Sequence, residues 1–306
     1  MKSKKILITL GDYNGIGPVV IQNALNDPKI KKMDISLIGD RSIINKLKIN
    51  NNKIDFIYRS NKVVFNPGKP TIHSGRASLD YLHHSIELIK SGKASKLVTG
   101  PISKEAIQKA GSRFKGHTDL LQSAFSINNV IMAFWSKKIK VSLSTIHIPL
   151  DQVIGSISSD LLLKQLEIID SFFVRTLGHK PKIGLCGINP HASENGTIGN
   201  HDLKITVPAV KKAKKKKINV SGPYPSDTLF VRDNLKNFDV FHAIYHDQGL
   251  IPFKMLSFDT GVNFTINLPF VRTSPDHGTA YDIAWKKNPN PNSMIESIKL
   301  ANSLNF

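Results

Sequence analysis

The sequence has a single cysteine, few acidic residues and no long hydrophobic run. The one cysteine, Cys186, excludes an internal disulfide bond and fits a reducing compartment. No apolar stretch approaches the roughly 20 residues that a membrane-spanning helix needs. The basic segment 1–5 leads directly into a strand-like run and does not resemble a secretion signal. We therefore expect a cytoplasmic protein, in which Cys186 is a small core residue.

The shortage of acidic side chains leaves a large excess of positive charge. Lysine and arginine number 42 against 23 aspartate and glutamate residues, which gives a formal net charge of +19. The densest basic run, 211–217, lies between a helical and a strand-like pattern, so we interpret it as the solvated end of a helix. No zinc finger and no interleaving of basic and aromatic residues accompanies it. A non-catalytic, nucleic-acid-associated protein has the net charge as its only support, whereas a positive field also suits an anionic small-molecule substrate.

Strand-like and helical patterns alternate along the 306 residues. The strand-like runs are Ile6–Leu10, Asp34–Ile38 and Leu97–Thr99, and the helical patterns are Val19–Leu25, Ala77–Ile89, Lys104–Ala110 and Leu161–Val174. Ser103 is a candidate N-cap for the third of these helices. This alternation predicts an α/β fold with a largely parallel sheet, and the length favours two lobes that flank a cleft.

Three further apolar runs each end in a histidine and a turn. They are Val141–Pro149 with His147, Lys182–His191 with His191, and Asp239–Gly249 with His246. Ligands of open parallel sheets bind at the carboxyl ends of the strands. Three imidazoles at that edge are able to hold a divalent metal and leave coordination positions for a substrate. The alternative is that each histidine is an ordinary loop residue.

The first turn, Gly11–Pro18, contains three glycines but does not match the dinucleotide-binding pattern G-x-G-x-x-G. A tight turn from a strand into a helix, with Pro18 at an early helical position, explains the same residues.

Eight sequence blocks, in order along the chain, carry a family resemblance. They are Gly11-Asp12 with Gly15–Pro18, Thr99–Lys104, Gly116–Thr118, His147–Leu150, Asn189–Ala192, Gly222-Pro223 with Pro225–Thr228, Tyr245–Leu250 and Leu268–Ala280. With these blocks the chain resembles the 4-hydroxythreonine-4-phosphate dehydrogenase family, the NAD-dependent enzymes of vitamin B6 synthesis. The resemblance implies the two-lobed fold of isocitrate and isopropylmalate dehydrogenases, with an active-site cleft between the lobes, and a homodimer with active sites at its interface. We expect residues 1–115 with 270–306 to form the cofactor-side lobe and 116–269 the metal and dimerisation lobe.

The resemblance also assigns roles to individual residues. The implied metal ligands are His147, His191 and His246, and the implied substrate contacts are His117, Thr118, Lys254, Asn263 and Arg272. Asp247, Asp227 or a histidine is expected to move the proton, and Asp276, His277, Gly278 and Asp282 are expected to bind NAD, with NADP left open. Zinc, cobalt and magnesium are all left open as the metal. Structural alternatives exist for Thr118, as the N-cap of a helix beginning at Asp119, and for Arg272, as a bridge between lobes.

The implied reaction oxidises 4-hydroxy-L-threonine 4-phosphate to a 2-amino-3-oxo acid phosphate. That product decarboxylates to 3-amino-2-oxopropyl phosphate, on the route to pyridoxal phosphate. The alternative substrate is a related phosphorylated sugar acid such as 4-phospho-erythronate. Arginine and lysine supply the fixed positive charge that phosphate and carboxylate groups require in either case.

The chain departs from the family pattern at three places. The first turn has Tyr13-Asn14 where the family usually has Pro-Ala, and Val19 where it has Glu. The loop after His191 reads 193-SENGT-197 where the family usually has Gly-Glu-Gly-Gly and one more residue. Trp285 and Lys287 each replace a usual glycine. None of these changes removes an implied metal or substrate residue, but Trp285 lies close to the expected cofactor segment.

Overall fold

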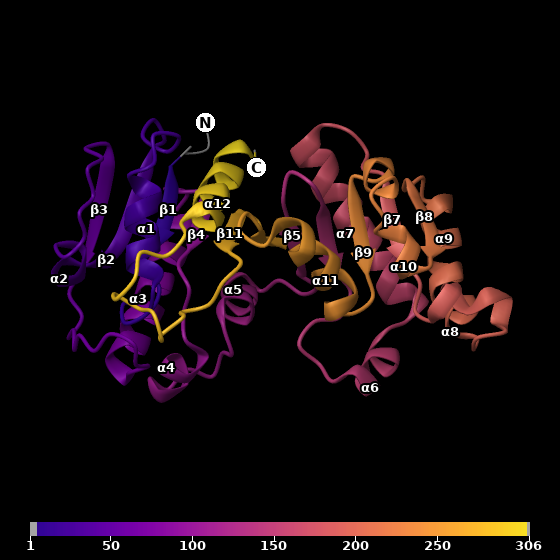
Figure 1. Ribbon diagram of the computed structural model, residues 1–306, viewed down its shortest axis with the longest axis horizontal. Helices are drawn as coiled ribbons and strands as arrows, with labels where there is room; N and C mark the ends of the chain where they lie inside the picture. The colour runs from indigo at the N-terminus through magenta and orange to yellow at the C-terminus, as the bar shows by residue number, and fades with distance from the viewer. Residues whose placement is uncertain (1–4, 305–306) are drawn as a thin grey trace. The chain divides into compact units, whose positions relative to one another are not determined.

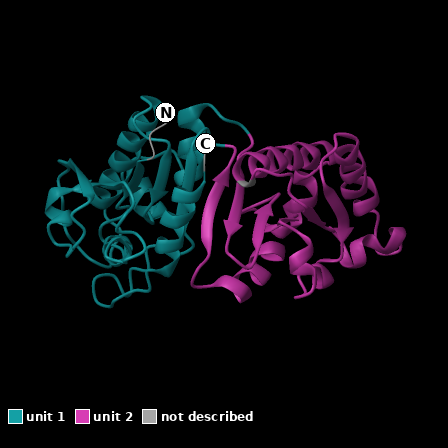
Figure 2. Ribbon diagram, turned by 90° about the horizontal axis from the view of Figure 1, so that it is seen from above, with its two compact units in different colours: residues 1–128, 268–306 teal, residues 129–267 magenta. Residues whose placement is uncertain are grey.

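The computed structural model describes residues 5–304, which divide into two compact units (Figure 2). Unit 1 consists of Met1–Asn128 and Leu268–Phe306, and unit 2 of Asn129–Asn267. The chain thus passes from unit 1 into unit 2 and back, with changes at 128/129 and 267/268 where we expected 115/116 and 269/270. The cofactor-side role of one lobe and the metal-binding role of the other stay predictions.

Unit 1 contains a parallel sheet with the strand order β3-β2-β1-β4-β11 (Figure 1). The strands are β1 (Ile6–Thr9), β2 (Ile35–Asp40), β3 (Ile54–Arg59), β4 (Lys96–Thr99) and β11 (Val271–Pro275). Every residue of β1, β2, β4 and β11 is buried. Burial along the whole strand is typical of parallel strands that are covered on both faces.

The helices of unit 1 follow the strands in alternation. They are α1 (Gly17–Leu25), α2 (Arg41–Ile44), α3 (Ile72–Lys90), α4 (Lys104–Lys109), α5 (His117–Phe125) and α12 (Asn292–Ser303). Helix α12 packs on β4 and β11 and against α1, while α3 packs on β1 and β2. The hydroxyl of Ser103 accepts a hydrogen bond from the Ala106 backbone N–H, so the predicted N-cap of α4 is confirmed.

Unit 2 contains a mixed sheet with the strand order β10-β5-β6-β9-β7-β8. The strands are β5 (Ile131–Trp135), β6 (Lys140–Leu143), β7 (Ile183–Cys186), β8 (Val220–Tyr224), β9 (Val240–Ala243) and β10 (Val262–Ile266). Strand β5 runs antiparallel to both β10 and β6, whereas β6, β9, β7 and β8 are parallel neighbours. The carboxyl ends of these four strands therefore lie along one edge.

Helices and short turns of unit 2 connect these strands. They are α6 (Leu150–Val153), η1 (Ile154–Ser156), α7 (Ser159–Leu177), η2 (Pro190–Gly196), α8 (His201–Lys204), α9 (Thr206–Lys215), α10 (Ser226–Leu229), η3 (Asn234–Asn237) and α11 (His246–Ser257). Helices α7 and α9 pack against each other, and α11 packs on β6 and β9. Ion pairs join Lys212 to Asp160 and Lys216 to Glu167. The basic run is therefore the exposed end of α9, as predicted.

The expected α/β architecture is confirmed. Each predicted strand and helix has a counterpart, although α3 begins five residues before the predicted range 77–89 and ends one residue after it. Cys186 is a buried residue of β7, and burial raises its pKa to about 12, so its thiol is an inert core group. No helix among residues 5–304 has the length and apolar character needed to cross a membrane.

Candidate active site

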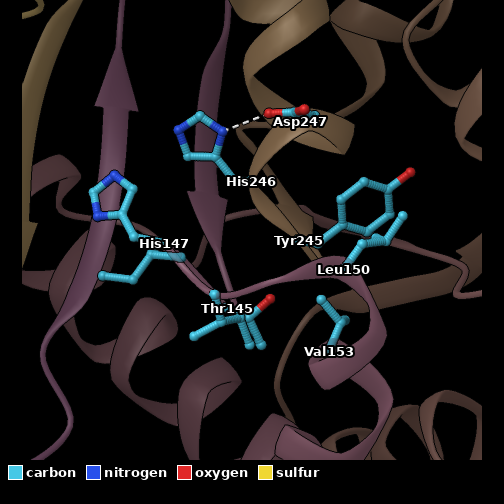
Figure 3. A pocket seen from close by; sticks show the side chains of 9 residues that line it. Thr145, His147, Leu150, Val153, Tyr245, His246 and Asp247 are labelled. Atoms are coloured by element: carbon cyan, nitrogen blue, oxygen red, sulfur yellow. Dashed lines mark hydrogen bonds and ion pairs between the residues drawn. The ribbon is translucent and has the colours of Figure 1, made fainter.

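Two of the three strand-end histidines lie side by side in unit 2. His147 follows β6 and His246 follows β9, and these two strands are parallel neighbours. Just after the paired residues, the Thr145 backbone N–H donates a hydrogen bond to the Ile244 carbonyl. The two imidazole ring centroids are 5.5 Å apart (Figure 3). Both rings line a pocket of about 290 Å³. Its lining residues are Thr145, Ile146, His147, Ile148, Leu150, Val153, Tyr245, His246 and Asp247.

Asp247 orients the ring of His246. The Nδ1 atom of His246 lies 2.7 Å from Asp247 Oδ1, and Figure 3 shows this contact as a dashed line. A carboxylate at Nδ1 holds the proton there and leaves the Nε2 lone pair for another partner. Histidines that bind metals commonly carry such a carboxylate on the second ring nitrogen. Asp247 thus contacts the His246 ring directly, and its part in proton transfer stays a prediction.

The separation of the two rings fits a shared metal ion. Two imidazoles bound to a tetrahedral zinc ion at about 2 Å have ring centroids roughly 5 Å apart, close to the distance between His147 and His246. Within residues 5–304, however, no three histidine, cysteine, aspartate or glutamate side chains are grouped so that they could hold a metal ion. One chain thus offers two imidazoles of the expected three, and His191 is not brought to the pair.

His191 lies on the turn η2, which follows β7, the other neighbour of β9. Its side chain is 62% exposed, and its Nδ1 atom lies 3.5 Å from Glu194 Oε2. The backbone of residues 191–195 has positive φ throughout, the left-handed region in which glycine is favoured. The usual glycines of the resembling family fall within this turn, which explains why they occur there.

Gln248 joins the loops at the carboxyl edge of unit 2, a role that the sequence analysis missed. Its amide nitrogen donates to the Gly187 carbonyl and to the Ser226 hydroxyl, at 2.7 and 2.8 Å. Its amide oxygen accepts from the Ile244 backbone at 2.6 Å. One side chain thus links the ends of β7 and β9 and helix α10. The predicted acid–base residue Asp227 is exposed in the first turn of α10.

A buried polar network lies behind the histidine pair. His242 of β9 contacts the Ser142 hydroxyl of β6 at 2.9 Å through Nδ1 and the Gln165 side chain at 3.2 Å through Nε2. Burial lowers the pKa of His242 to about 4, so its ring is neutral near pH 7. His242 is therefore a core residue that links β9 to β6 through Ser142, a few residues before His246 and His147.

This buried histidine predicts a loss of stability in acid. A free histidine has a pKa of about 6.5, so this side chain is protonated below about pH 6.5 in the unfolded chain. In the folded chain His242 is protonated only near pH 4. The corresponding stability is complete above pH 6.5 and is lost as the pH falls to 4, by about 3 kcal/mol. Urea unfolding between pH 7 and 4.5 measures this slope. His242→Gln should flatten it, while a substitution at the exposed His83 should not; equal slopes in all three proteins would refute the assignment.

In unit 1, a buried arginine and a neutral histidine form an anion-binding candidate. Arg272 on β11 is 4% exposed, and its Nη2 atom donates to the Thr99 hydroxyl at 2.9 Å. Burial lowers the pKa of Arg272 to about 10, so the guanidinium stays charged near pH 7. Burial, and to a lesser degree Arg272, lowers the pKa of His117 well below its usual range. The Nε2 atom of His117 is buried and without a hydrogen-bond partner among the described residues.

His117 and Thr118 lie in the first turn of α5, whose N-cap is Gly116 without a side-chain hydrogen bond. Helix N-termini attract phosphate and carboxylate groups through their free N–H groups. The alternative role of Thr118 as N-cap of a helix from Asp119 is wrong, because the helix begins two residues earlier. Of the other predicted substrate contacts, Lys254 lies on α11 and Asn263 on β10, both in unit 2.

The first turn of unit 1 is held to segment 276–287. The Tyr281 hydroxyl donates to the buried carboxylate of Asp12 at 2.7 Å. Trp285 has a φ of 61°, which accounts for the glycine usual at this position, and its indole N–H donates to the Tyr13 carbonyl at 2.9 Å. The departures Tyr13 and Trp285 thus contact each other.

The four predicted cofactor-binding residues, Asp276, His277, Gly278 and Asp282, lie in this same irregular segment after β11. The Asp276 backbone N–H donates to the Ser293 hydroxyl at 2.9 Å, which joins the segment to α12. A side chain at Gly278 would meet no atom within 4 Å, so the backbone is open here.

Comparison with known proteins identifies relatives along nearly the whole chain. The family described as pyridoxal phosphate biosynthetic protein PdxA matches residues 11–301. The 4-hydroxythreonine-4-phosphate dehydrogenase of Sulfurihydrogenibium sp. is 40% identical over 318 residues, 97% of each chain. The D-threonate 4-phosphate dehydrogenase of Salmonella typhimurium is 35% identical over 326 residues, 99% of this chain and 100% of the other.

Solved structures agree with this relationship. A crystal structure of 4-hydroxythreonine-4-phosphate dehydrogenase from Klebsiella pneumoniae has a TM-score of 0.90 at 32% identity and covers 99% of both chains. An isocitrate dehydrogenase from Methylococcus capsulatus has a TM-score of 0.52 at 13% identity, with 97% of this chain and 84% of that chain covered. The second likeness concerns the fold alone and agrees with the expected fold class.

Proposed function

Because the chain belongs to the family of the pyridoxal phosphate biosynthetic protein PdxA, we propose that it oxidises 4-hydroxy-L-threonine 4-phosphate, with a nicotinamide cofactor and a divalent metal. Membership of this family makes the chain an oxidoreductase of the dehydrogenase class with a role in vitamin B6 synthesis. The main observation in support of a divalent metal is the pair of imidazoles, His147 and His246, which line a pocket in unit 2.

The proposed reaction removes two hydrogens from one C–O unit of the substrate. The C–H bond at the hydroxyl-bearing carbon breaks, its hydride passes to the oxidised nicotinamide ring, and the hydroxyl proton goes to a base. A divalent metal, when bound, lowers the pKa of that hydroxyl and offsets the developing negative charge. The 3-oxo acid that results loses carbon dioxide because the carboxylate lies β to the new carbonyl.

The residues of this chain have distinct parts in the proposal. His147, His191 and His246 hold the metal, and Asp247 keeps the His246 ring in the orientation that leaves Nε2 available. Imidazole ligands favour zinc or cobalt over magnesium, which prefers oxygen. Asp247 and Asp227, both exposed, are the candidate proton acceptors.

Several basic and polar side chains are proposed to bind the anionic groups of the substrate. The Arg272 guanidinium and the α5 N-terminus, with His117 and Thr118, supply positive charge and N–H donors, and Lys254 supplies an ammonium group. A bound phosphate or carboxylate also lowers the cost of keeping the Arg272 charge buried. Asn263 adds a neutral polar contact.

The cofactor is proposed to lie against segment 276–282. The open backbone at Gly278 permits close approach of a nucleotide, and the hydrogen bond from Trp285 to the Tyr13 carbonyl holds the chain three residues after this segment. NAD is the proposed hydride acceptor, and NADP stays an alternative.

A homodimer is proposed because residues 5–304 of one chain bring two of the three imidazoles together. Helix α11 begins at His246 and exposes Ile251, Met255 and, at its C-cap, Phe258, which are 60%, 82% and 71% exposed. Their spacing of four and three residues places them on one helix face. Two copies related by a two-fold axis would bury this apolar face against the same surface of the partner.

A relative that is 35% identical to this chain and is named D-threonate 4-phosphate dehydrogenase favours a second candidate substrate. It is a four-carbon sugar-acid phosphate, the class expected as the alternative, and differs from 4-hydroxythreonine phosphate by a hydroxyl in place of the amino group. Both substrates present a phosphate, a carboxylate and an oxidisable hydroxyl to the same residues.

A substrate comparison tests the proposal. We expect the metal-loaded protein to reduce NAD with 4-hydroxy-L-threonine 4-phosphate. Its kcat/KM should be about tenfold higher than for D-threonate 4-phosphate or 4-phospho-erythronate, which corresponds to about 1.4 kcal/mol of transition-state free energy. The rise of NADH absorbance measures each rate. A reversed preference would move the assignment to the sugar-acid phosphates, and no turnover of any of the three would reject it.

A further inference from the structure

The turn that carries His191 has a costly backbone conformation. Residues 191–195 all have φ between 42° and 68°, although none of them is glycine. In this left-handed region the Cβ atom crowds the following carbonyl oxygen, so a run of five such residues persists only where neighbouring groups hold it.

Asp202 provides that support from the first turn of α8. Its carboxylate is fully buried and accepts hydrogen bonds from both sides of His191. On the N-terminal side, Oδ1 accepts from the Ile188 backbone at 2.8 Å and Oδ2 from the Asn189 backbone at 3.0 Å. On the C-terminal side, Oδ2 accepts from the Ser193 hydroxyl at 2.8 Å.

The same carboxylate is anchored away from the turn. Thr206, in the first turn of α9, donates its hydroxyl to Asp202 Oδ1 at 2.7 Å. Ser193, in addition to its bond to Asp202, accepts from the Asn189 side-chain amide at 3.1 Å. Residues 188–193 therefore form a loop closed by one buried carboxylate, while the His191 side chain at its tip is exposed.

We propose that Asp202 is the positioning residue of the metal site: it fixes the left-handed turn so that His191 projects from the edge of the sheet toward a metal shared with a partner chain. This proposal rests on the proposed function, in which His191 is a ligand. A carboxylate is suited to this task because it accepts four hydrogen bonds at once. Asparagine, of nearly the same shape, would turn an N–H₂ group toward at least one donor.

The chain offers a matched pair of variants. Ser193→Ala and Thr206→Val each remove one hydroxyl that donates to the same carboxylate, and both residues are fully buried. Of these two hydroxyls, only that of Ser193 belongs to the His191 turn. Any general effect of a lost hydrogen bond on folding therefore appears in both variants, whereas an effect on the position of His191 appears in Ser193→Ala alone.

The experiment titrates the metal-stripped full-length protein with Co²⁺ and follows the visible absorption of the bound ion, with thermal unfolding recorded for each variant. We expect His191→Ala to lose most of the affinity and Ser193→Ala to bind Co²⁺ about tenfold more weakly than the parent, as is typical when a ligand's support is removed. Thr206→Val should remain within about twofold of the parent, and Asp202→Asn, provided that it folds, should resemble Ser193→Ala.

Two outcomes would overturn the positioning role alone. In the first, Ser193→Ala binds Co²⁺ with the affinity of the parent while His191→Ala binds it more weakly. In the second, Thr206→Val and Ser193→Ala lose Co²⁺ affinity equally. Parental affinity in His191→Ala is distinguishable from both, because it would remove His191 from the metal site and reject that part of the proposed function, together with the role of Asp202.

Discussion

Arg272→Ala is expected to lower kcat/KM by roughly 100-fold or more, about 3 kcal/mol of transition-state stabilisation, while the fold survives. The guanidinium is buried, and burial lowers its pKa only to about 10, so a full positive charge remains to meet an anionic group of the substrate. Arg272→Lys should also be damaging, because an ammonium group does not form the paired N–H contacts of a guanidinium. Steady-state kinetics and thermal unfolding of both variants measure the effect.

Thr99→Val is the control for this prediction. It removes the hydroxyl that accepts from Arg272 Nη2 but keeps the charge, so it should cost less activity than either arginine variant. Near-parental kcat/KM in Arg272→Ala would show that the arginine has a structural role only. A loss of folding in Arg272→Ala, with full activity in Arg272→Lys, would lead to the same conclusion.

His147→Ala and His191→Ala are each expected to reduce activity by roughly 1000-fold, because a metal that stabilises an oxyanion contributes several kcal/mol. The reason differs between the two residues. His147 is half of the imidazole pair seen within one chain, whereas His191 is not grouped with that pair and is proposed to serve the partner's site. Metal content per chain and the rate of NADH formation check both variants, with His83→Ala as an exposed control. Full activity and metal content in either site variant would exclude that histidine as a ligand.

The strands and their terminal histidines could be predicted because the pattern that reveals them is local. A short apolar run followed by a turn marks a buried parallel strand, and β6, β7 and β9 each lie within such a run and end three to five residues before its histidine. The contact between the His147 and His246 rings could not be predicted from such local patterns. It depends on β9 lying between β6 and β7, an order that no local pattern contains.

Several features of the site depend on long-range contacts and left no signal in the sequence. Asp202 reads as an ordinary residue of a helix, and its role appears only when its carboxylate meets the backbone of 188–189 and the Ser193 hydroxyl. Gln248 joins three segments that are far apart along the chain. The family resemblance marked Trp285 as unusual, but its positive φ and its bond to Tyr13 required the fold.

The central claim is that histidines of two chains complete one active site, and a mixed dimer tests it most directly. Subunits with His147→Ala and subunits with His191→Ala are co-expressed with different tags, and the heterodimer is purified and confirmed by mass. If His147 and His246 of one chain meet His191 of the other, one site of this heterodimer has both defects and the second is intact. We predict NADH formation at about half the parental rate per dimer, against near-zero rates for both mutant homodimers. Near-zero activity of the confirmed heterodimer would contradict the claim, since it would place all three histidines of each site in the same chain.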